Sequence, residues 1–187
     1  SIQSTGVRYS SVEKVVARYV DYREKQDANA YSDGTAELLD TFKATGGPQD
    51  WAQTIGNGHR TSTRAGAPLK AVAIRDVAKV LAAEGIATTA DLRDVDVARR
   101  KNFEAAWRKV VGQRSGITWR YAGMLAGMPG VKPDRMICRF VRGSLDPRRT
   151  RVTPDFAEAI VTAAAEELGM SATALDHAIW RFQRGRK

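Results

Sequence analysis

The sequence predicts an all-α fold, a two-lobed helical bundle. Apolar residues recur at spacings of three and four along most of the chain, and capping residues or glycines bound these segments. No stretch of useful length alternates between apolar and polar residues as a half-buried strand would. The chain has 187 residues, 43% of them hydrophobic, and a mean hydropathy of −0.39, which suits a single globular domain or two small lobes sharing a core.

The first predicted helix covers 10–20 and opens with a capping box, in which Ser10 is the N-cap and Glu13 lies three residues later. A second helix, over 35–45, is capped by its first residue and ends at a Gly-Gly-Pro sequence. One further turn of helix is predicted at 51–55.

The segment 55–68, IGNGHRTSTRAGAP, is predicted to be a loop, because glycines and hydroxyl residues replace apolar periodicity there. Its composition fits an ordinary loop and fits equally a loop whose amides and side chains contact phosphates. In the second case His59, Arg60 and Arg64 are candidate nucleic-acid contacts.

Outside the central segment 112–141, the rest of the chain is predicted to form helices separated by glycines and capping residues. In the helix before that segment, Val97, Phe103 and Trp107 belong to the expected core stripe, and Phe182 is expected to face inward in the last helix. The predicted helical ranges are 69–85, 89–92 (a short turn), 96–111, 153–169 and 171–184.

The positive charge of the chain is concentrated in one region. Lys and Arg number 30 against 21 Asp and Glu, a net charge of +9. The range 99–151 holds 14 basic and three acidic residues, a balance of +11, and the remainder is slightly acidic at −2. Such a distribution is typical of a face that binds phosphates, although a solvated arginine-rich surface is the alternative interpretation.

Composition also argues against several classes of protein. Cys138 is the only cysteine, which excludes an internal disulfide, a four-cysteine iron–sulfur cluster and a cysteine-based zinc site, and two histidines are too few for a metal centre. No apolar run approaches the roughly 18 residues of a membrane span. No signal peptide opens the sequence, so we expect a cytoplasmic protein, and the composition predicts no metal or small-molecule cofactor. Separate expectations are a monomer and, if the basic region binds nucleic acid, association with the nucleoid.

The segment 112–141 combines a glycine turn, a short helix and a second helix that Asp134 opens. Glycines at positive φ allow backbone amides to point outward together at the start of a helix, which favours an anion. The candidate phosphate contacts in this region are Gly112, Gln113, Arg114, Ser115, Gly116, Thr118, Arg120 and Lys132, with Arg148 and Arg149 in the loop that follows.

The sequences GITWRYAGMLAG and MPGVKPDRMICRFV resemble the helix-hairpin-helix and catalytic-aspartate segment of the helix-hairpin-helix DNA glycosylase superfamily, which includes endonuclease III and the bacterial alkylated-base glycosylases. LDHAIWRFQR, from Leu175 to Arg184, is similar to the closing helix of that family. The resemblance implies one domain over 1–187, with a lobe formed by roughly 1–50 and 140–187 and a central helical lobe of roughly 51–139. It also implies double-stranded DNA as the partner.

The activity that this resemblance implies is hydrolysis of the N-glycosidic bond of a damaged or modified base, as in base-excision repair. Asp134 would stabilise the positive charge that develops on the sugar, and its position at a helix N-cap favours the ionised carboxylate. Trp119, Tyr121 and His59 are candidates to stack on a flipped base. The nucleophilic lysine of bifunctional members is replaced by Trp119 or Arg120, so no strand cleavage is expected.

Several alternatives remain open at this point. In a second register the hairpin is Gly127–Lys132 and the aspartate is Asp155. Asp134 can also be a capping residue alone, and the protein can be a DNA-binding module without catalysis or a basic helical protein with another partner. A monovalent cation in the hairpin is a further expectation from the resemblance.

Overall fold

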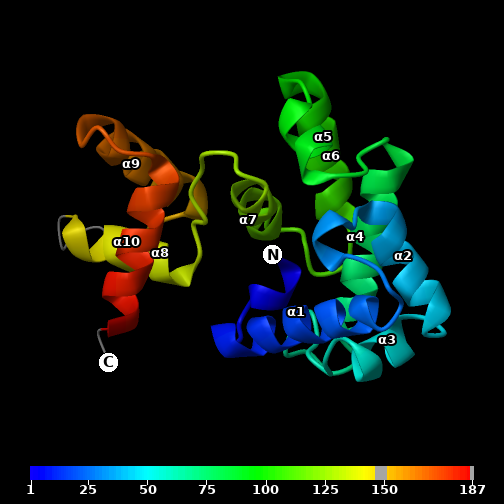
Figure 1. Cartoon of the computed structure of the whole chain (residues 1–187). Helices are drawn as coiled ribbons and strands as arrows, with labels where there is room; N and C mark the ends of the chain where they lie inside the picture. Colours follow the sequence, from blue (N-terminus) through cyan, green and yellow to red (C-terminus); the bar gives the residue numbers. More distant parts are fainter. Residues whose placement is uncertain (146–150, 186–187) are drawn as a thin grey trace. The chain divides into compact units, whose positions relative to one another are not determined.

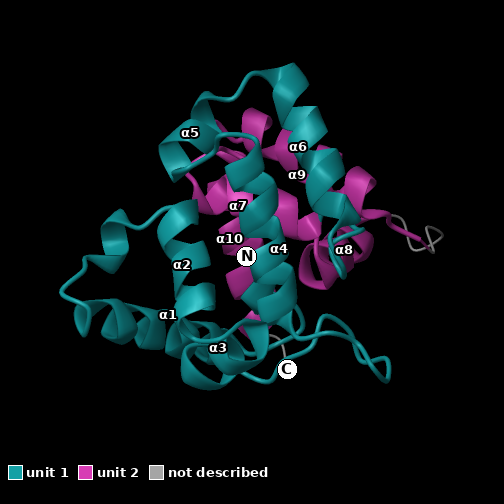
Figure 2. Ribbon diagram, turned by 90° about the vertical axis from the view of Figure 1, so that its right-hand side faces the viewer, with its two compact units in different colours: residues 1–116 teal, residues 117–187 magenta. Residues whose placement is uncertain are grey.

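The computed structural model describes residues 1–145 and 151–185 of the chain. Within these residues there are ten α-helices, two short 3₁₀-helices and no β-strand, which confirms the all-α prediction (Figure 1). The chain forms two compact units, Ser1–Gly116 and Ile117–Lys187, coloured separately in Figure 2. This grouping differs from the expected lobes, which combined 1–50 with 140–187.

The first unit is built around helix α4, which contacts α2, α3, α6 and η1. Its core consists of buried apolar residues from four helices and includes a stacked pair, Phe42 and Trp51, whose ring centroids are 4.6 Å apart. In chain order the elements are η1 (Ile2–Ser4), α1 (Tyr9–Glu24), η2 (Ala30–Ser32), α2 (Thr35–Ala44), α3 (Pro48–Thr54), α4 (Lys70–Ala83), α5 (Thr89–Asp94) and α6 (Val97–Lys109).

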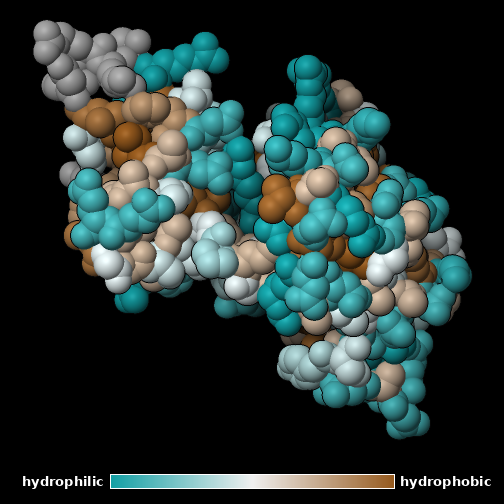
Figure 3. Space-filling model, turned by 90° about the horizontal axis from the view of Figure 1, so that it is seen from above, coloured by the Kyte–Doolittle hydropathy of each residue, from teal (hydrophilic) through white to brown (hydrophobic). Residues whose placement is uncertain are grey.

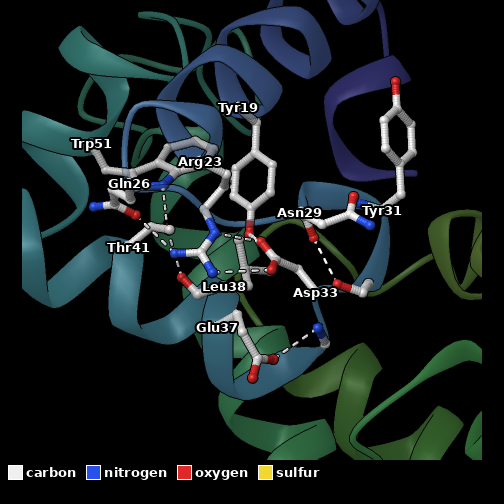
Figure 4. A network of polar contacts seen from close by, with 12 residues as sticks. Tyr19, Arg23, Gln26, Asn29, Tyr31, Asp33, Glu37, Leu38, Thr41 and Trp51 are labelled. Atoms are coloured by element: carbon white, nitrogen blue, oxygen red, sulfur yellow. Dashed lines mark hydrogen bonds and ion pairs between the residues drawn. The ribbon is translucent and has the colours of Figure 1, made fainter.

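A polar network fixes α1 against the segment that follows η2 (Figure 4). Asp33 accepts hydrogen bonds of 2.7 Å from the Tyr19 hydroxyl and from Arg23 Nε. Burial and the bond to Asp33 raise the pKa of Tyr19 far above its ordinary value. Burial alone would raise the pKa of Asp33, but the bonds from Arg23 and Tyr19 outweigh it and lower that pKa. The network therefore holds an ionised carboxylate in a half-buried position.

The N-caps predicted at Ser10 and Thr35 are wrong, and at Thr35 a contact from a distant segment accompanies the helix start. Helix α1 begins at Tyr9 after Arg8, and no side chain caps it, so Ser10 and Glu13 form no capping box there. Helix α2 has Gly34 as its N-cap, and the Thr35 hydroxyl donates instead to the carbonyl of Ile86 at 2.9 Å.

The predicted core stripe is confirmed in part. Phe103 and Trp107 are buried in α6, but Val97 at the first position of that helix is 70% exposed. Phe182 is 52% exposed and meets Phe140 edge-to-face at 5.9 Å, so it covers another ring and does not enter the core. Figure 3 shows hydrophobic patches among the mainly hydrophilic surface of the face in view.

The second unit contains α7 (Ile117–Leu125), α8 (Arg135–Ser144), α9 (Pro154–Glu167) and α10 (Ala172–Gly185). Helices α8, α9 and α10 contact one another in pairs. Their shared core consists of the buried residues Val131, Ile137, Val141, Ala157, Val161 and Ile179. No helix among the described residues is long and apolar enough to cross a membrane.

Candidate functional site

The glycine turn predicted at Gly112–Gly116, called the hairpin below, lies at the end of the first unit directly after α6. It consists of two successive turns, closed by hydrogen bonds from the Gln113 amide to the Val110 carbonyl and from the Gly116 amide to the Gln113 carbonyl, both 3.0 Å. Arg108 Nε donates to the carbonyl of Arg114 at 3.0 Å. These bonds use two of the amides that the sequence suggested for phosphate binding.

Gly112 is required in this hairpin for two reasons. Its φ of +76° lies in the left-handed region, and a Cβ atom added there would lie 2.6 Å from Cβ of Thr61. Thr61 belongs to the 55–68 loop, so the hairpin and that loop are in contact within the first unit. The two segments that the sequence suggested as phosphate-binding loops, about fifty residues apart, thus lie side by side.

The 55–68 segment is irregular, as predicted, and its ends are tied together. The amide of Thr61 donates to the carbonyl of Pro68 at 2.9 Å, and the amide of Lys70 donates to the carbonyl of His59 at 2.8 Å. Arg60 is exposed, and its Nη1 donates to the carbonyl of Ala67 at 2.5 Å, which ties this side chain to the other end of the loop. The exposed tip therefore presents Arg64 to solvent.

Not every predicted hairpin contact has an accessible side chain. Gln113 is buried, its side-chain amide nitrogen donates to the carbonyl of Val111 at 3.1 Å, and its backbone amide donates to the carbonyl of Val110, so both of its donor groups are already engaged within the hairpin. Arg114 and Ser115 are exposed, whereas Gly116 is buried. His59 is half-buried, and its Nδ1 is a buried atom without a hydrogen-bond partner among the described residues.

In the second unit, Asp134 caps α8 as the sequence predicts. Its Oδ1 accepts from the amide of Met136 at 2.7 Å and from the amide of Ile137 at 3.4 Å. Oδ2 accepts no hydrogen bond from the described residues, and the residue is half-buried. One oxygen of the carboxylate thus holds the helix and the other remains for a ligand or water.

Helix α10 holds the loop that carries Asp134. The Thr173 hydroxyl oxygen accepts from the Gly130 amide at 3.0 Å and the same hydroxyl donates to the Gly130 carbonyl at 3.2 Å. One turn later, Asp176 Oδ1 accepts from the amide of Lys132 at 2.9 Å. Lys132 in turn accepts from the Asp134 amide at 2.6 Å, so Thr173 and Asp176 position the capping carboxylate through the backbone.

Three further groups surround this loop and alter its electrostatics. Burial raises the pKa of Asp176 to about 6. The hydrogen bond from the Lys132 amide lowers this pKa, and the nearby charge of Asp134 raises it. Burial lowers the pKa of Lys132, and the charges of Asp134 and Asp176 partly oppose this shift. The Nζ of Lys132 lies 4.0 Å from the ring centroid of Tyr121. Burial raises the pKa of the Cys138 thiol, and the negative charge of Asp134 raises it further. A raised pKa is typical of a packed, unreactive thiol. The cluster is therefore a partly desolvated group of opposite charges.

Replacing Asp176 by Asn is expected to stabilise the protein at neutral pH. The folded-state pKa of about 6 lies above the ordinary 3.8, so Asp176 contributes stability below about pH 4 that is lost as pH rises through 6. Asn keeps the acceptor for the Lys132 amide and has no charge, so the free energy of unfolding at pH 7.5 should increase by about 2 kcal/mol.

Urea unfolding of both proteins at pH 4 and pH 7.5 measures this effect. The stabilisation should shrink toward zero at pH 4. The same difference in unfolding free energy at both pH values would contradict the burial of an ionisable Asp176.

Other predicted residues of the second unit are less available than the sequence suggested. Arg120 pairs with Asp155 at 2.7 Å and with Glu158 at 3.1 Å, so a phosphate would have to compete with two carboxylates. Thr118 and Trp119 are buried, which favours a packing role for both side chains over contact with DNA or a base. Tyr121 is half-buried beside Lys132. Arg148 and Arg149 lie outside the described residues.

The second hairpin register has a structural counterpart as well. Gly127 has a φ of +91° in the connection between α7 and α8, and Asp155 lies in the first turn of α9. The cap of α9 is Thr153, however, and the side chain of Asp155 is 84% exposed and paired with Arg120. Asp134 is therefore the better candidate for a partly desolvated carboxylate.

No group of three or more metal-ligating side chains occurs among the described residues. In the hairpin, the carbonyls of Val110, Val111, Gln113 and Arg114 each accept a hydrogen bond. A monovalent cation would have to share these oxygens with the existing donors, and its presence stays a prediction.

Sequence reasoning missed Thr173 and Asp176. Asp176 lies in the segment that resembles a closing helix, and Thr173 lies just before that segment. The sequence shows only that the two residues are three positions apart and so share one helical face. Their partners, Gly130 and Lys132, are more than forty residues away. A buried aspartate in an otherwise apolar helical stripe is the signal that could have identified one of them.

Fold and site together define an all-helical protein of two compact units, one with a glycine hairpin and one with a helix-capping carboxylate. The chain belongs to the family described as Domain of unknown function (DUF8548), whose model matches residues 1–184. Searches of curated proteins and of solved structures find no match.

Proposed function

We propose that the protein is a monofunctional DNA glycosylase that hydrolyses the N-glycosidic bond of a damaged or modified base. The observation that carries the proposal is the geometry of Asp134. Its Oδ1 is held by two backbone amides of α8, and its Oδ2 has no partner among the described residues. A fixed carboxylate with one unengaged oxygen is suited to stabilise a cationic sugar and to orient water.

The chemistry requires a charge that is already in position when the base departs. In the transition state the bond to the base is largely broken and positive charge builds on the sugar ring. A preorganised carboxylate stabilises that charge without reorganisation, most strongly where water is excluded. Asp176 and Thr173 supply the preorganisation through the backbone at Lys132 and Gly130, which makes them positioning residues and not catalytic ones.

Binding of double-stranded DNA is proposed for the hairpin and the 55–68 loop of the first unit. Their contact at Gly112 and Thr61 forms one surface on which Arg64, Arg114 and Ser115 are exposed. Backbone amides and these side chains suit phosphate contacts, which give affinity without base specificity. Such binding should weaken as salt concentration rises, as counterion release requires.

A DNA-binding module without catalysis is the second candidate. The observation that favours it is the commitment of Asp134 to the α8 cap, which is sufficient to explain an aspartate at that position. The absence of a lysine at Trp119 and Arg120 fits either candidate.

A panel of lesion-bearing duplexes separates the two candidates. The protein is incubated with 30-base-pair duplexes that carry alkylated, deaminated or oxidised bases, and abasic sites are revealed by alkali. The glycosylase proposal predicts alkali-sensitive product from at least one duplex and no strand cleavage without alkali. Tight binding to the panel with no abasic product on any member would contradict catalysis and support the module.

A further inference from the structure

The outward face of α10 has an arrangement that the proposed function does not use. His177, Trp180, Arg181 and Arg184 recur at positions i, i+3, i+4 and i+7, so they share one face of the helix. With Gly185 they line a shallow, open depression. The buried residues of α10 are Asp176, Ile179 and Gln183.

The planar groups of this face form a column along the helix. The rings of His177 and Trp180 are 5.8 Å apart at an interplanar angle of 21°, and the Arg184 guanidinium lies 5.1 Å from the Trp180 ring centroid. The cation–π contact orders the Arg184 side chain before any ligand arrives. Part of the entropy cost of binding is thereby already met in the free protein.

The charge on this face is unopposed. Asp176 is the single acidic residue of α10, and it is buried, with its Oδ1 engaged by the Lys132 amide. Neither Arg181 nor Arg184 forms an ion pair within the described part of the chain, in contrast to Arg120 and Arg23. Two guanidinium groups one turn apart, both without a carboxylate, favour an anionic partner.

We infer that the outward face of α10 binds a nucleic-acid strand, with phosphates at Arg181 and Arg184 and a base against the His177–Trp180 column. The flat surface of stacked rings beside two guanidinium groups suits this partner, because bases offer planar faces and the backbone offers phosphates at regular intervals. An acidic peptide would satisfy the charges but would leave the rings unused. The inference goes beyond the proposed function, since it needs neither the hairpin nor Asp134.

Tryptophan fluorescence reports on this face selectively. Trp51, Trp107 and Trp119 are buried, whereas Trp180 is half-exposed. The full chain is titrated with a 12-nucleotide single strand, with the corresponding duplex and with poly-glutamate. The expected result is quenching by nucleic acid that is absent from Trp180→Phe, and the stronger of the two nucleic-acid responses identifies the form that the face prefers.

Charge removal provides the second arm of the experiment. Arg181→Gln with Arg184→Gln should weaken binding about tenfold at low salt and reduce the slope of log affinity against log salt by about 2, since two phosphate contacts are lost. Both side chains are exposed, so the fold should be retained, and circular dichroism checks this. Arg142→Gln, at an exposed position in the last turn of α8, is the matched control. It should change the affinity and the salt slope only by the small amount expected from removing one distant positive charge.

The outcomes separate this inference from the proposed function. Unchanged affinity in the double variant, quenching that persists in Trp180→Phe, or equal quenching by poly-glutamate would each overturn the α10 inference. None of these results affects base release by Asp134. Conversely, a protein that releases no base but loses affinity through Arg181 and Arg184 would support the α10 surface alone.

Discussion

Replacing Asp134 by Asn should reduce the rate of base release by at least about a hundredfold, which is the effect typical of removing one preorganised charge from a reacting centre. Asn is as good an N-cap as Asp, so α8 should keep its start and the protein its stability. DNA affinity should be unchanged or slightly higher, because a negative charge near phosphates is removed. Single-turnover assays on the responsive duplex, with binding measured separately, test this expectation.

Asp155→Asn is the matched control for this substitution. Asp155 is the aspartate of the alternative register, and its exposed side chain pairs with Arg120 on the surface of the second unit. The variant should retain base release within about twofold, since an exposed ion pair contributes little. If Asp155→Asn abolished the activity and Asp134→Asn did not, the register centred on Asp134 would be wrong.

Gly112→Ala should be the most disruptive single-methyl substitution in the hairpin. A left-handed conformation costs an L-residue about 1 to 2 kcal/mol, and the new Cβ would lie 2.6 Å from Cβ of Thr61, so the backbone must move as well. The free energy of unfolding should fall by about 2 to 4 kcal/mol, given the combination of backbone strain and overpacking. DNA affinity should fall by roughly tenfold or more, because the two loops can no longer lie in contact.

Gly66→Ala is the control that distinguishes the effect of backbone strain from the effect of moving the two loops apart. Gly66 has a similar φ of +74°, but a Cβ there would meet nothing within 4 Å. Its substitution should cost about 1 kcal/mol and leave DNA affinity unchanged. Equal losses of stability and affinity in the two variants would show that the contact between Gly112 and Thr61 has no role in binding. Urea unfolding and salt-dependent titrations measure both quantities.

Some helix starts with a local capping side chain were predictable, although the cap of α5 is Thr88 and not the neighbouring Thr89 that the sequence suggests. Asp134 and Thr153 each accept a backbone hydrogen bond two or three residues further along the chain, and both were recognised in the sequence. Gly34 was missed as a cap because its position depends on the segment before α5. There, the Thr35 amide donates to the Ala87 carbonyl, and a Cβ at Gly34 would lie 2.3 Å from that oxygen. No local pattern records such a contact.

The candidate site was predictable to the same extent. The hairpin glycines and Asp134 follow from turn and cap chemistry, which is local. The ion pairs of Arg120 depend on Asp155 and Glu158 more than thirty residues away, and the positioning role of Asp176 depends on its burial. Exposure of Arg64 and burial of Gln113 are likewise results of packing and not of composition.

Binding of a charged transition-state mimic tests the central role of Asp134 without knowledge of the natural lesion. A duplex with a pyrrolidine nucleotide carries a protonated ring nitrogen where positive charge develops on the sugar, and a tetrahydrofuran nucleotide is its neutral counterpart. The wild-type protein should bind the pyrrolidine duplex about a hundredfold more tightly, as expected for a transition-state mimic, and Asp134→Asn should lose this preference. Equal affinity of the wild-type protein for both duplexes would contradict the proposal that this carboxylate stabilises a cationic sugar.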